Sequence, residues 1–510
     1  MCEPNIVTFY TQALGSSHEQ SQKPCQDNGL CYSQQGIDIA IVCDGHGGDT
    51  YVRSHIGSQL AAKVAQEKML QFIQKTPVSL FSGKKSAVTC KPLQNPLRDK
   101  WGNQVPSSAL TESQREVLKQ YQDYFKESGK YPEIEKAFRT LFKEICDEWL
   151  NAIWKDAKER AFTVHEKQKL GCEKRIEKAY GTTLIAAVRT KDYWFAFHIG
   201  DGKLFACDKL MQWTEPVPWD CNCFMNMTTS LCDHSPVDEF RYAFDGTGVF
   251  PVAIVLGSDG IDDTFIHMHL IHKFYSQLLT VFNERDKGDA TKMLAIHLAE
   301  LSKKGSHDDM SIAAIIDKSD LQTAVDYYRI ISEVQQLNVE KERKQCAIED
   351  LQKKYDKAIA VYDKLRKQRD EHAYSQWHWW LRILLEKADK MQQYSDIQSE
   401  IKLSQAHAAD LADKISNQNT EFNKWLITAK QQVDRLKESA EAIKRMVYPS
   451  QTGQDSPVEK QQQVVLSMED SPSDVYLKSA QASLSEEDIA RMDKESEAQV
   501  KEIFTSKRKK

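Results

Sequence analysis

Four apolar runs in this sequence are each joined directly to aspartate, and they are the feature that most restricts the fold. Three of them, IDIAIVCD, YWFAFHIGD and VAIVLGSD, end in Asp44, Asp201 and Asp259, whereas SHDDMSIAAII begins with Asp308 and Asp309. Apolar runs of this length, bounded by turn residues, are typical of buried β-strands. If these strands are neighbours, their carboxylates meet at one rim of the core.

Carboxylates gathered at one rim would repel one another and raise some of their own pKa values. Divalent cations remove this repulsion, and oxygen ligands without histidine or cysteine suit Mg²⁺ or Mn²⁺ better than zinc. A single aspartate at a strand end is more often a solvated or capping side chain. The prediction of a metal site therefore depends on the four strands together.

A glycine-rich segment follows Asp44 and reads GHGG. Gly45 has no side chain, so its carbonyl could reach a metal, and Gly47 and Gly48 allow a phosphate group to approach closely. His46 could donate a proton near neutral pH. A purely structural role for this histidine is an equal alternative.

Five short motifs occur in a fixed order along the chain: DGHGG at 44–48, GTT at 181–183, IGDGK at 199–203, GSDGIDD at 257–263 and SHDDMS at 306–311. This succession resembles the metal-dependent serine/threonine protein phosphatases of type 2C, over about residues 8–318. The resemblance implies an α+β fold, a four-layer α-β-β-α sandwich of two antiparallel sheets flanked by helices. It also places two metal ions, Mn²⁺ or Mg²⁺, at one end of the sandwich.

The resemblance further implies a role for each matching residue. Asp44 would bridge both metals, the Gly45 carbonyl would bind one of them, and Asp259 and Asp308 would hold the first metal. His46 matches the proposed general acid.

Three more aspartates match the family's pattern, in positions next to the two main metal sites. Asp27, in PCQDN, would contact metal-bound water, whereas Asp201 and Asp263 match acids of a third, weaker metal site. The expected reaction is attack of a metal-activated water on a phosphoserine or phosphothreonine monoester. The implied partners are a phosphoprotein substrate and a cognate serine/threonine kinase.

The sequence departs from the family pattern where phosphate binds. The family's arginine, five residues before Asp27, is replaced by Gln22, and Lys23 or His18 could substitute without the bidentate grip of arginine. Asp309 stands where an asparagine is usual. These changes resemble a divergent bacterial-type branch.

Other interpretations remain at this point. The main alternative is a catalytically inactive phosphatase-like domain that binds phosphoproteins as a scaffold, and the missing arginine is its main support. A haloacid-dehalogenase-type phosphatase needs a second aspartate where His46 stands. A dinucleotide-binding fold does not explain the later aspartates.

Residues 1–318 are expected to form the phosphatase-like domain, with a largely helical insertion at about 80–170. The first part of the insertion, from SGKKSAVTC to about residue 108, looks like a loop, and helices are expected at 111–128 and 132–165. The second helix has an apolar face, made of Ile134, Phe138, Phe142, Ile145, Trp149 and Ile153.

Residues 319–448 are expected to form a coiled coil or helical hairpin that serves oligomerisation or docks a partner helix. Their apolar residues recur three and four apart, as in the series Ile348, Leu351, Tyr355, Ala358, Tyr362 and Leu365, and again from Tyr394 to Trp425. The aromatic run WHWWLRILL at 377–385 fits the core of a helix interface, with a ligand-binding aromatic cage as the alternative. Residues 449–510 are expected to be a flexible linker and a short helical, basic tail.

The net charge and the cysteine content restrict the partners and the cellular location that the sequence fits. A net charge of −6 gives no support to a nucleic-acid partner, and neither a membrane-spanning run nor a secretory signal is recognisable. Most of the 12 cysteines are expected to be free thiols, which favours a reducing, cytoplasmic location. A zinc site at Cys221, Cys223, Cys232 and His234 is a less favoured alternative.

Overall fold

The computed structural model describes residues 5–90, 126–218 except 172 and 174, 228–377 except 266, and 387–448, together with single residues between 106 and 122. The chain divides into two compact units between Tyr328 and Arg329. Each unit is described separately.

The first unit contains two antiparallel sheets. One has the strand order β1 (Ile6–Ala13), β11 (Met310–Asp317), β10 (Ala253–Gly257), β7 (Lys203–Cys207) and β8 (Trp213–Thr214). The other has the order β2 (Asn28–Gln34), β3 (Ile37–Cys43), β5 (Leu184–Arg189), β6 (Trp194–Ile199), β9 (Arg241–Asp245) and β4 (Lys85–Thr89).

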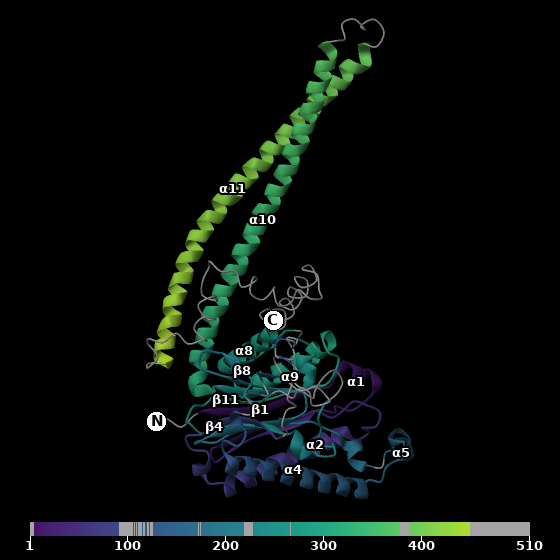
Figure 1. The fold of residues 1–510 in the computed structure, drawn as a ribbon, viewed down its shortest axis with the longest axis vertical. Helices are drawn as coiled ribbons and strands as arrows, with labels where there is room; N and C mark the ends of the chain where they lie inside the picture. The colour runs from purple at the N-terminus through teal and green to yellow at the C-terminus, as the bar shows by residue number, and fades with distance from the viewer. Residues whose placement is uncertain are drawn as a thin grey trace. The chain divides into compact units, whose positions relative to one another are not determined.

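Helices cover the outer face of each sheet. In Figure 1 the layers run from α8 (Met268–Glu284) and α9 (Lys287–Lys304), through the strands, to α2 (Ser54–Lys75) and α4 (Pro132–Glu159). Three hydrophobic clusters fill the spaces between these four layers. The predicted α-β-β-α sandwich is therefore confirmed. The remaining short elements of this unit are α1 (Ser16–Ser21), η1 (Val78–Leu80), α5 (Val164–Leu170), η3 (Ile176–Tyr180), α6 (Pro236–Glu239) and α7 (Asp259–Asp262).

Strand β3 shows how one sequence serves two of these clusters. Successive side chains of a strand point to opposite faces of the sheet. Ile39, Ile41 and Cys43 accordingly lie in the cluster shared with α2 and α4, whereas Ala40 and Val42 lie between the two sheets. Because both faces are buried, the strand reads as an unbroken apolar run that leads to Asp44.

Helix α4 has the predicted apolar face, and all six of its named residues are buried. It ends at Glu159, however, six residues before the expected boundary. Thr163 and Glu166 form a capping box there, so a separate helix, α5, starts at Val164.

The beginning of the insertion also differs from expectation. Lys85–Thr89 forms β4, which pairs with β9 at the edge of the second sheet, and not a loop. The run is too short and too polar to give a strand signal of its own, and pairing with β9 supplies it. Most of the expected helix at 111–128 lies outside the described residues.

Two long helices, α10 (Lys318–Trp377) from Arg329 onward and α11 (Lys387–Val447), provide the second unit. The two helices run antiparallel, as contacts between the start of α10 and the end of α11 show. Gln432 donates a hydrogen bond to Glu333, and the ammonium group of Lys344 lies 5.4 Å from the centre of the Trp425 ring. Further along, Ala358 packs with Ala408 and Leu411. Most of the aromatic run at 377–385 and all of 449–510 lie outside the described residues.

Two general properties follow from the described residues. No helix among them is both long and apolar enough to cross a membrane. The eight cysteines that the structure describes are free thiols, in agreement with the sequence-based expectation.

Candidate active site

The sheet topology brings the aspartate-bearing strand ends together. Strands β3 and β6 are both antiparallel to β5, so Asp44 and Asp201 follow strands that end at the same edge of one sheet. In the other sheet, β10 is antiparallel to β11, so Asp259 after β10 lies at the edge where Asp308 precedes β11. The predicted convergence of these residues is therefore present in the described structure.

The carboxyl groups are close enough to alter one another's protonation. Burial raises the pKa of Asp44 well above its usual value, and the neighbouring charges of Asp259, Asp27 and Asp201 add to the effect. Burial also raises the pKa of Asp259 to about 6, although a hydrogen bond with Asp44 partly offsets this. A cation bound among these carboxyl groups would remove this mutual repulsion.

Asp27 is a deeply buried member of this cluster. Its side chain is 2 % exposed, and one oxygen accepts a hydrogen bond of 2.7 Å from the Ser311 hydroxyl. Burial and the charge of Asp309 raise its pKa to about 8.

Asp201 and Asp263 border the cluster. Burial raises the pKa of both, and each lies close enough to another site acid to interact with it electrostatically. Asp263 is the more exposed of the two.

The glycine-rich segment after β3 is tightly tied to the segment before β5. The Asp44 carbonyl accepts hydrogen bonds of 2.8 Å from the Thr183 amide and the Thr182 hydroxyl. A side chain at Gly45 would bring a Cβ to 2.6 Å from the carbonyl oxygen of Gln26. Glycine at 45 is thus required by packing.

The surroundings of His46 favour the neutral form of its ring. Burial, assisted by the charge of Lys178, lowers the pKa of its imidazole to about 4, so the ring is neutral at pH 7. Its Nε2 lies 2.8 Å from the Ser230 hydroxyl, and its ring packs edge-on against Tyr51. The sequence contained no signal for Ser230.

The two candidate phosphate-binding residues lie in different surroundings. The Lys23 ammonium group is 3.5 Å from the Gly47 carbonyl, so it borders the glycine-rich segment. His18 is buried, and its ring nitrogens face carboxylates: Nδ1 lies 3.0 Å from Asp309 and Nε2 lies 3.8 Å from Asp308. His18 is thus engaged with acids in the described structure and is not open to a phosphate. Gln22, which replaces the family's arginine, has a positive φ of 54° at the end of α1.

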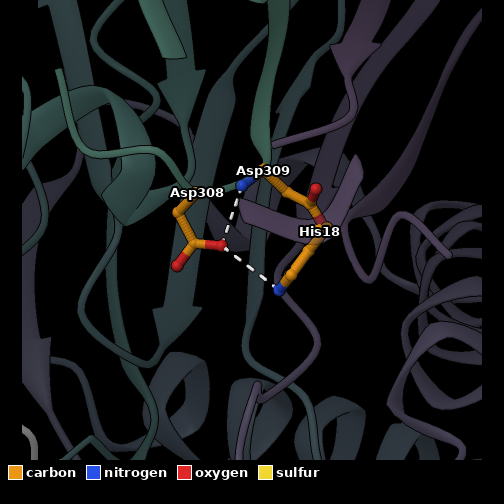
Figure 2. A group of neighbouring side chains, drawn as sticks. All are labelled: His18, Asp308 and Asp309. Carbon is orange, nitrogen blue, oxygen red and sulfur yellow. Dashed lines mark hydrogen bonds and ion pairs between the residues drawn. The ribbon is translucent and has the colours of Figure 1, made fainter. Parts of the chain in front are cut away.

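Sequence reasoning missed the structural role of Asp309. One of its oxygens accepts a hydrogen bond of 2.6 Å from the Gly15 amide, and the other accepts one of 2.6 Å from the Gln26 amide. Its side chain is 2 % exposed, whereas that of the adjacent Asp308 is 55 % exposed. Figure 2 shows both aspartates beside His18. The only sequence signal was an aspartate in place of the usual asparagine.

The less favoured zinc site falls only partly on residues that the structure describes. Cys221 and Cys223 lie outside the described residues. Of the other two residues, Cys232 is buried and makes a contact of 3.2 Å with the Ser230 hydroxyl, whereas His234 is exposed.

Comparison with protein families gives a match to the model for protein phosphatase 2C over residues 14–299, more than half of the chain. The chain belongs to the protein phosphatase 2C family. It is therefore a protein serine/threonine phosphatase, as the ordered motifs predicted. No curated protein sequence matches the chain.

Solved structures of phosphatases are similar at low identity. A bacterial serine phosphatase is 13 % identical, covers 62 % of this chain and 98 % of its own, and gives a TM-score of 0.34. The serine/threonine phosphatase Stp1 from Staphylococcus aureus is 13 % identical, with 61 % and 94 % coverage and a TM-score of 0.33. The catalytic domain of the phosphatase PstP, solved with two manganese ions, is 13 % identical, with 61 % and 97 % coverage and a TM-score of 0.31. The family assignment rests on the family model alone.

Proposed function

We propose that this phosphatase hydrolyses phosphoserine and phosphothreonine monoesters in proteins and depends on Mn²⁺ or Mg²⁺ for activity. The observation that carries the proposal is the cluster of buried acids in which Asp44 and Asp259 share a hydrogen bond. A folded domain gains nothing by burying repelling carboxyl groups unless a cation neutralises them.

The donor set suits a hard divalent cation. Asp44, Asp259 and Asp308 offer carboxylate oxygens from both sheets, and the segment after β3 is packed so closely that the Gly45 carbonyl is held in place. Mg²⁺ and Mn²⁺ prefer such oxygen ligands. Asp44 would contact two ions, the Gly45 carbonyl would bind one of them, and Asp259 and Asp308 would hold the first.

Two bound ions would supply an activated water and neutralise charge on the phosphoryl oxygens. The chain's own residues would position the reactants. Asp27, which is fixed by Ser311, would orient water near the ions, and Lys23 would attract the phosphate beside Gly47. His46 is neutral at pH 7, so it would contribute a hydrogen bond rather than a positive charge.

Asp201 and Asp263 are proposed to bind a third, weaker ion at the margin. Both interact with acids of the main cluster, and Asp263 is exposed enough to exchange an ion with solvent.

We further propose that a cognate serine/threonine kinase supplies the phosphoprotein, and that α10 and α11 serve oligomerisation or partner docking. A chain with no membrane-spanning helix among its described residues and with free thiols fits a cytoplasmic setting for this exchange.

The proposal is tested by phosphate release from phosphopeptides, and by calorimetric Mn²⁺ titration of the protein after removal of metal with chelator. We expect Asp44→Asn and Asp259→Asn each to lower kcat at least about a hundredfold, since each removes a charge that holds an ion. Both variants should weaken Mn²⁺ binding while their circular dichroism stays unchanged.

Asp147→Asn is the matched control, because it neutralises an exposed carboxylate of α4 outside the cluster. It should match the wild-type protein in both measurements. Phosphopeptide binding without phosphate release, in the presence of Mn²⁺, would instead favour the inactive scaffold.

A further inference from the structure

We propose that His18 is a nitrogen ligand of the metal ion bound at Asp308, and that Asp309 holds the imidazole in the binding orientation. The inference rests on the proposed metal dependence. The histidine would add a nitrogen donor to a metal site for which the sequence indicated oxygen donors alone.

The geometry brings three side chains together within one small volume. The candidate ligand atoms of His18, Asp308 and Asp309 all lie within 4.8 Å of one another. Figure 2 shows a ring nitrogen of His18 and the Asp308 carboxylate pointing toward each other. The distance between Nε2 of His18 and the nearer Asp308 oxygen is 3.8 Å. Two atoms bound to one ion at about 2.0–2.2 Å lie at most about 4.4 Å apart, so this separation leaves room for an ion between them.

The carboxylate of Asp309 is held in place by backbone amides and lies beside the His18 ring. Both of its oxygens already accept backbone hydrogen bonds of 2.6 Å, from the Gly15 and Gln26 amides. The oxygen that accepts from Gln26 also lies 3.0 Å from Nδ1 of His18. With its carboxylate held at these points, Asp309 is poorly placed to bind an ion itself.

The charge of Asp309 favours one tautomer of His18. Nδ1 lies 3.0 Å from the Asp309 carboxylate, so a proton is favoured on Nδ1, and Nε2, which faces Asp308, is left to bind an ion. Histidine ligands of metals characteristically donate their other ring N–H to a carboxylate or carbonyl, which fixes the ring and strengthens the ligand.

Burial supports the same assignment. The His18 side chain is 10 % exposed, whereas that of Asp308 is 55 % exposed, so the ion would have the nitrogen on its protein side and water on the other. A buried imidazole whose two ring nitrogens both lie beside carboxylates has little access to a phosphate ester. This separates the inference from the earlier expectation that His18 binds phosphate.

A nitrogen ligand changes metal preference. Imidazole binds transition ions more readily than it binds Mg²⁺, which favours oxygen donors and water. The site should therefore prefer Mn²⁺ over Mg²⁺ by more than an oxygen-only set would.

The test is pulsed electron paramagnetic resonance of Mn²⁺ bound to the full-length protein, which detects nitrogen nuclei bonded to the ion. We expect a ¹⁴N modulation in the wild-type protein that changes to the ¹⁵N pattern when histidine alone is labelled with ¹⁵N. This labelling experiment needs no substitution, so it does not depend on the folding of a variant.

Three variants identify which histidine is responsible. The modulation should vanish in His18→Gln and persist in His46→Gln and His307→Gln; His307 is exposed and bonds to the Ser16 hydroxyl. In calorimetry, His18→Gln and Asp309→Asn should each weaken Mn²⁺ binding about 10- to 100-fold, and weaken Mg²⁺ binding less.

Each other outcome has a defined meaning. Bound Mn²⁺ without a histidine modulation, or a modulation that survives in His18→Gln, would overturn the inference while leaving the metal-dependent phosphatase intact. A failure of the wild-type protein to bind Mn²⁺ at all would overturn both.

Discussion

The protonation of single carboxyl groups links the stability of the first unit to pH. The pKa of Asp27 is raised to about 8, mainly by burial, so the folded protein without metal holds a proton that the unfolded chain releases near pH 4. Because the folded state binds more protons, raising the pH favours unfolding. The pKa of His46 is lowered, which has the opposite effect, but only below about pH 6.5.

We therefore expect the melting temperature of the metal-free protein to fall between pH 6.5 and 8. Mn²⁺ should reduce this fall, because an ion stabilises the ionised carboxylates. Differential scanning calorimetry with chelator or with Mn²⁺ measures both slopes, and Asp27→Asn should flatten the metal-free one. A melting temperature that rises with pH in chelator would contradict the assignment.

Among single residues, the sequence was sufficient to predict the site aspartates but not the residue that orients its neighbours in the site. Asp44, Asp201 and Asp259 could be identified because each follows an apolar run that ends at a sheet edge. The orienting role of Asp309 could not, because its bonds to Gly15 and Gln26 join residues almost 300 positions apart. The pairing of β1 with β11, in which Ala13 lies opposite Met310, brings Gly15 beside Asp309.

Among the secondary-structure elements, α5 is attached to the start of α2 through one buried arginine. Arg53 is 5 % exposed, and its guanidinium donates to Glu166 at 2.7 Å and lies 4.0 Å from the centre of the Phe162 ring. It also forms an ion pair with Asp156 at 3.3 Å, and Asp156 is 6 % exposed. Arg53 lies five residues after the glycine-rich segment, so it ties the chain just beyond that segment to the end of the insertion.

Replacing Arg53 with Met should lower the free energy of unfolding by about 3 kcal/mol, because the buried Asp156 and the partly buried Glu166 lose the cation that they share. Urea denaturation measures this change. Arg139→Met is the matched control, since Arg139 forms a half-exposed ion pair with Asp238, and its loss should cost less than about 1 kcal/mol. Equal costs for the two substitutions would show that the Arg53 cluster adds nothing to stability.

The elements themselves were predicted unevenly, for a physical reason. The face of α4 repeats every three to four residues over a long helix, so its side chains could be named from the sequence. Strand β4 has five residues and depends on its neighbour β9. Periodicity therefore located the long helix and not the short edge strand.

At the scale of the whole molecule, the first unit extends beyond the last strand. Leu321, Ala324 and Val325 lie in the first turns of α10, are fully buried, and belong to the hydrophobic cluster that also contains residues of α8 and α9. The domain boundary expected at residue 318 would exclude these side chains. The first compact unit continues to Tyr328.

A chain that ends at Tyr328 should fold and keep kcat within about twofold of the full-length value, because every proposed site residue precedes it. A chain that ends at Asp317 loses the burial of the three residues and should be less stable by about 4 kcal/mol. Thermal denaturation and phosphate release compare the two truncations. Similar melting temperatures would show that the start of α10 is not part of this core.

The direct connection of strand β11 to helix α10 affects how a mechanical force would pass through the chain. Strand β11 ends at Asp317 and α10 begins at Lys318, so no slack separates the sheet from the long helix. The strand is bonded on both sides, to β1 and to β10, and Asp308 and Asp309 precede its far end. Tension applied to the helix would therefore pass directly into the strand, where the hydrogen bonds to β1 and β10 would resist it, and would be carried along the strand toward the two aspartates.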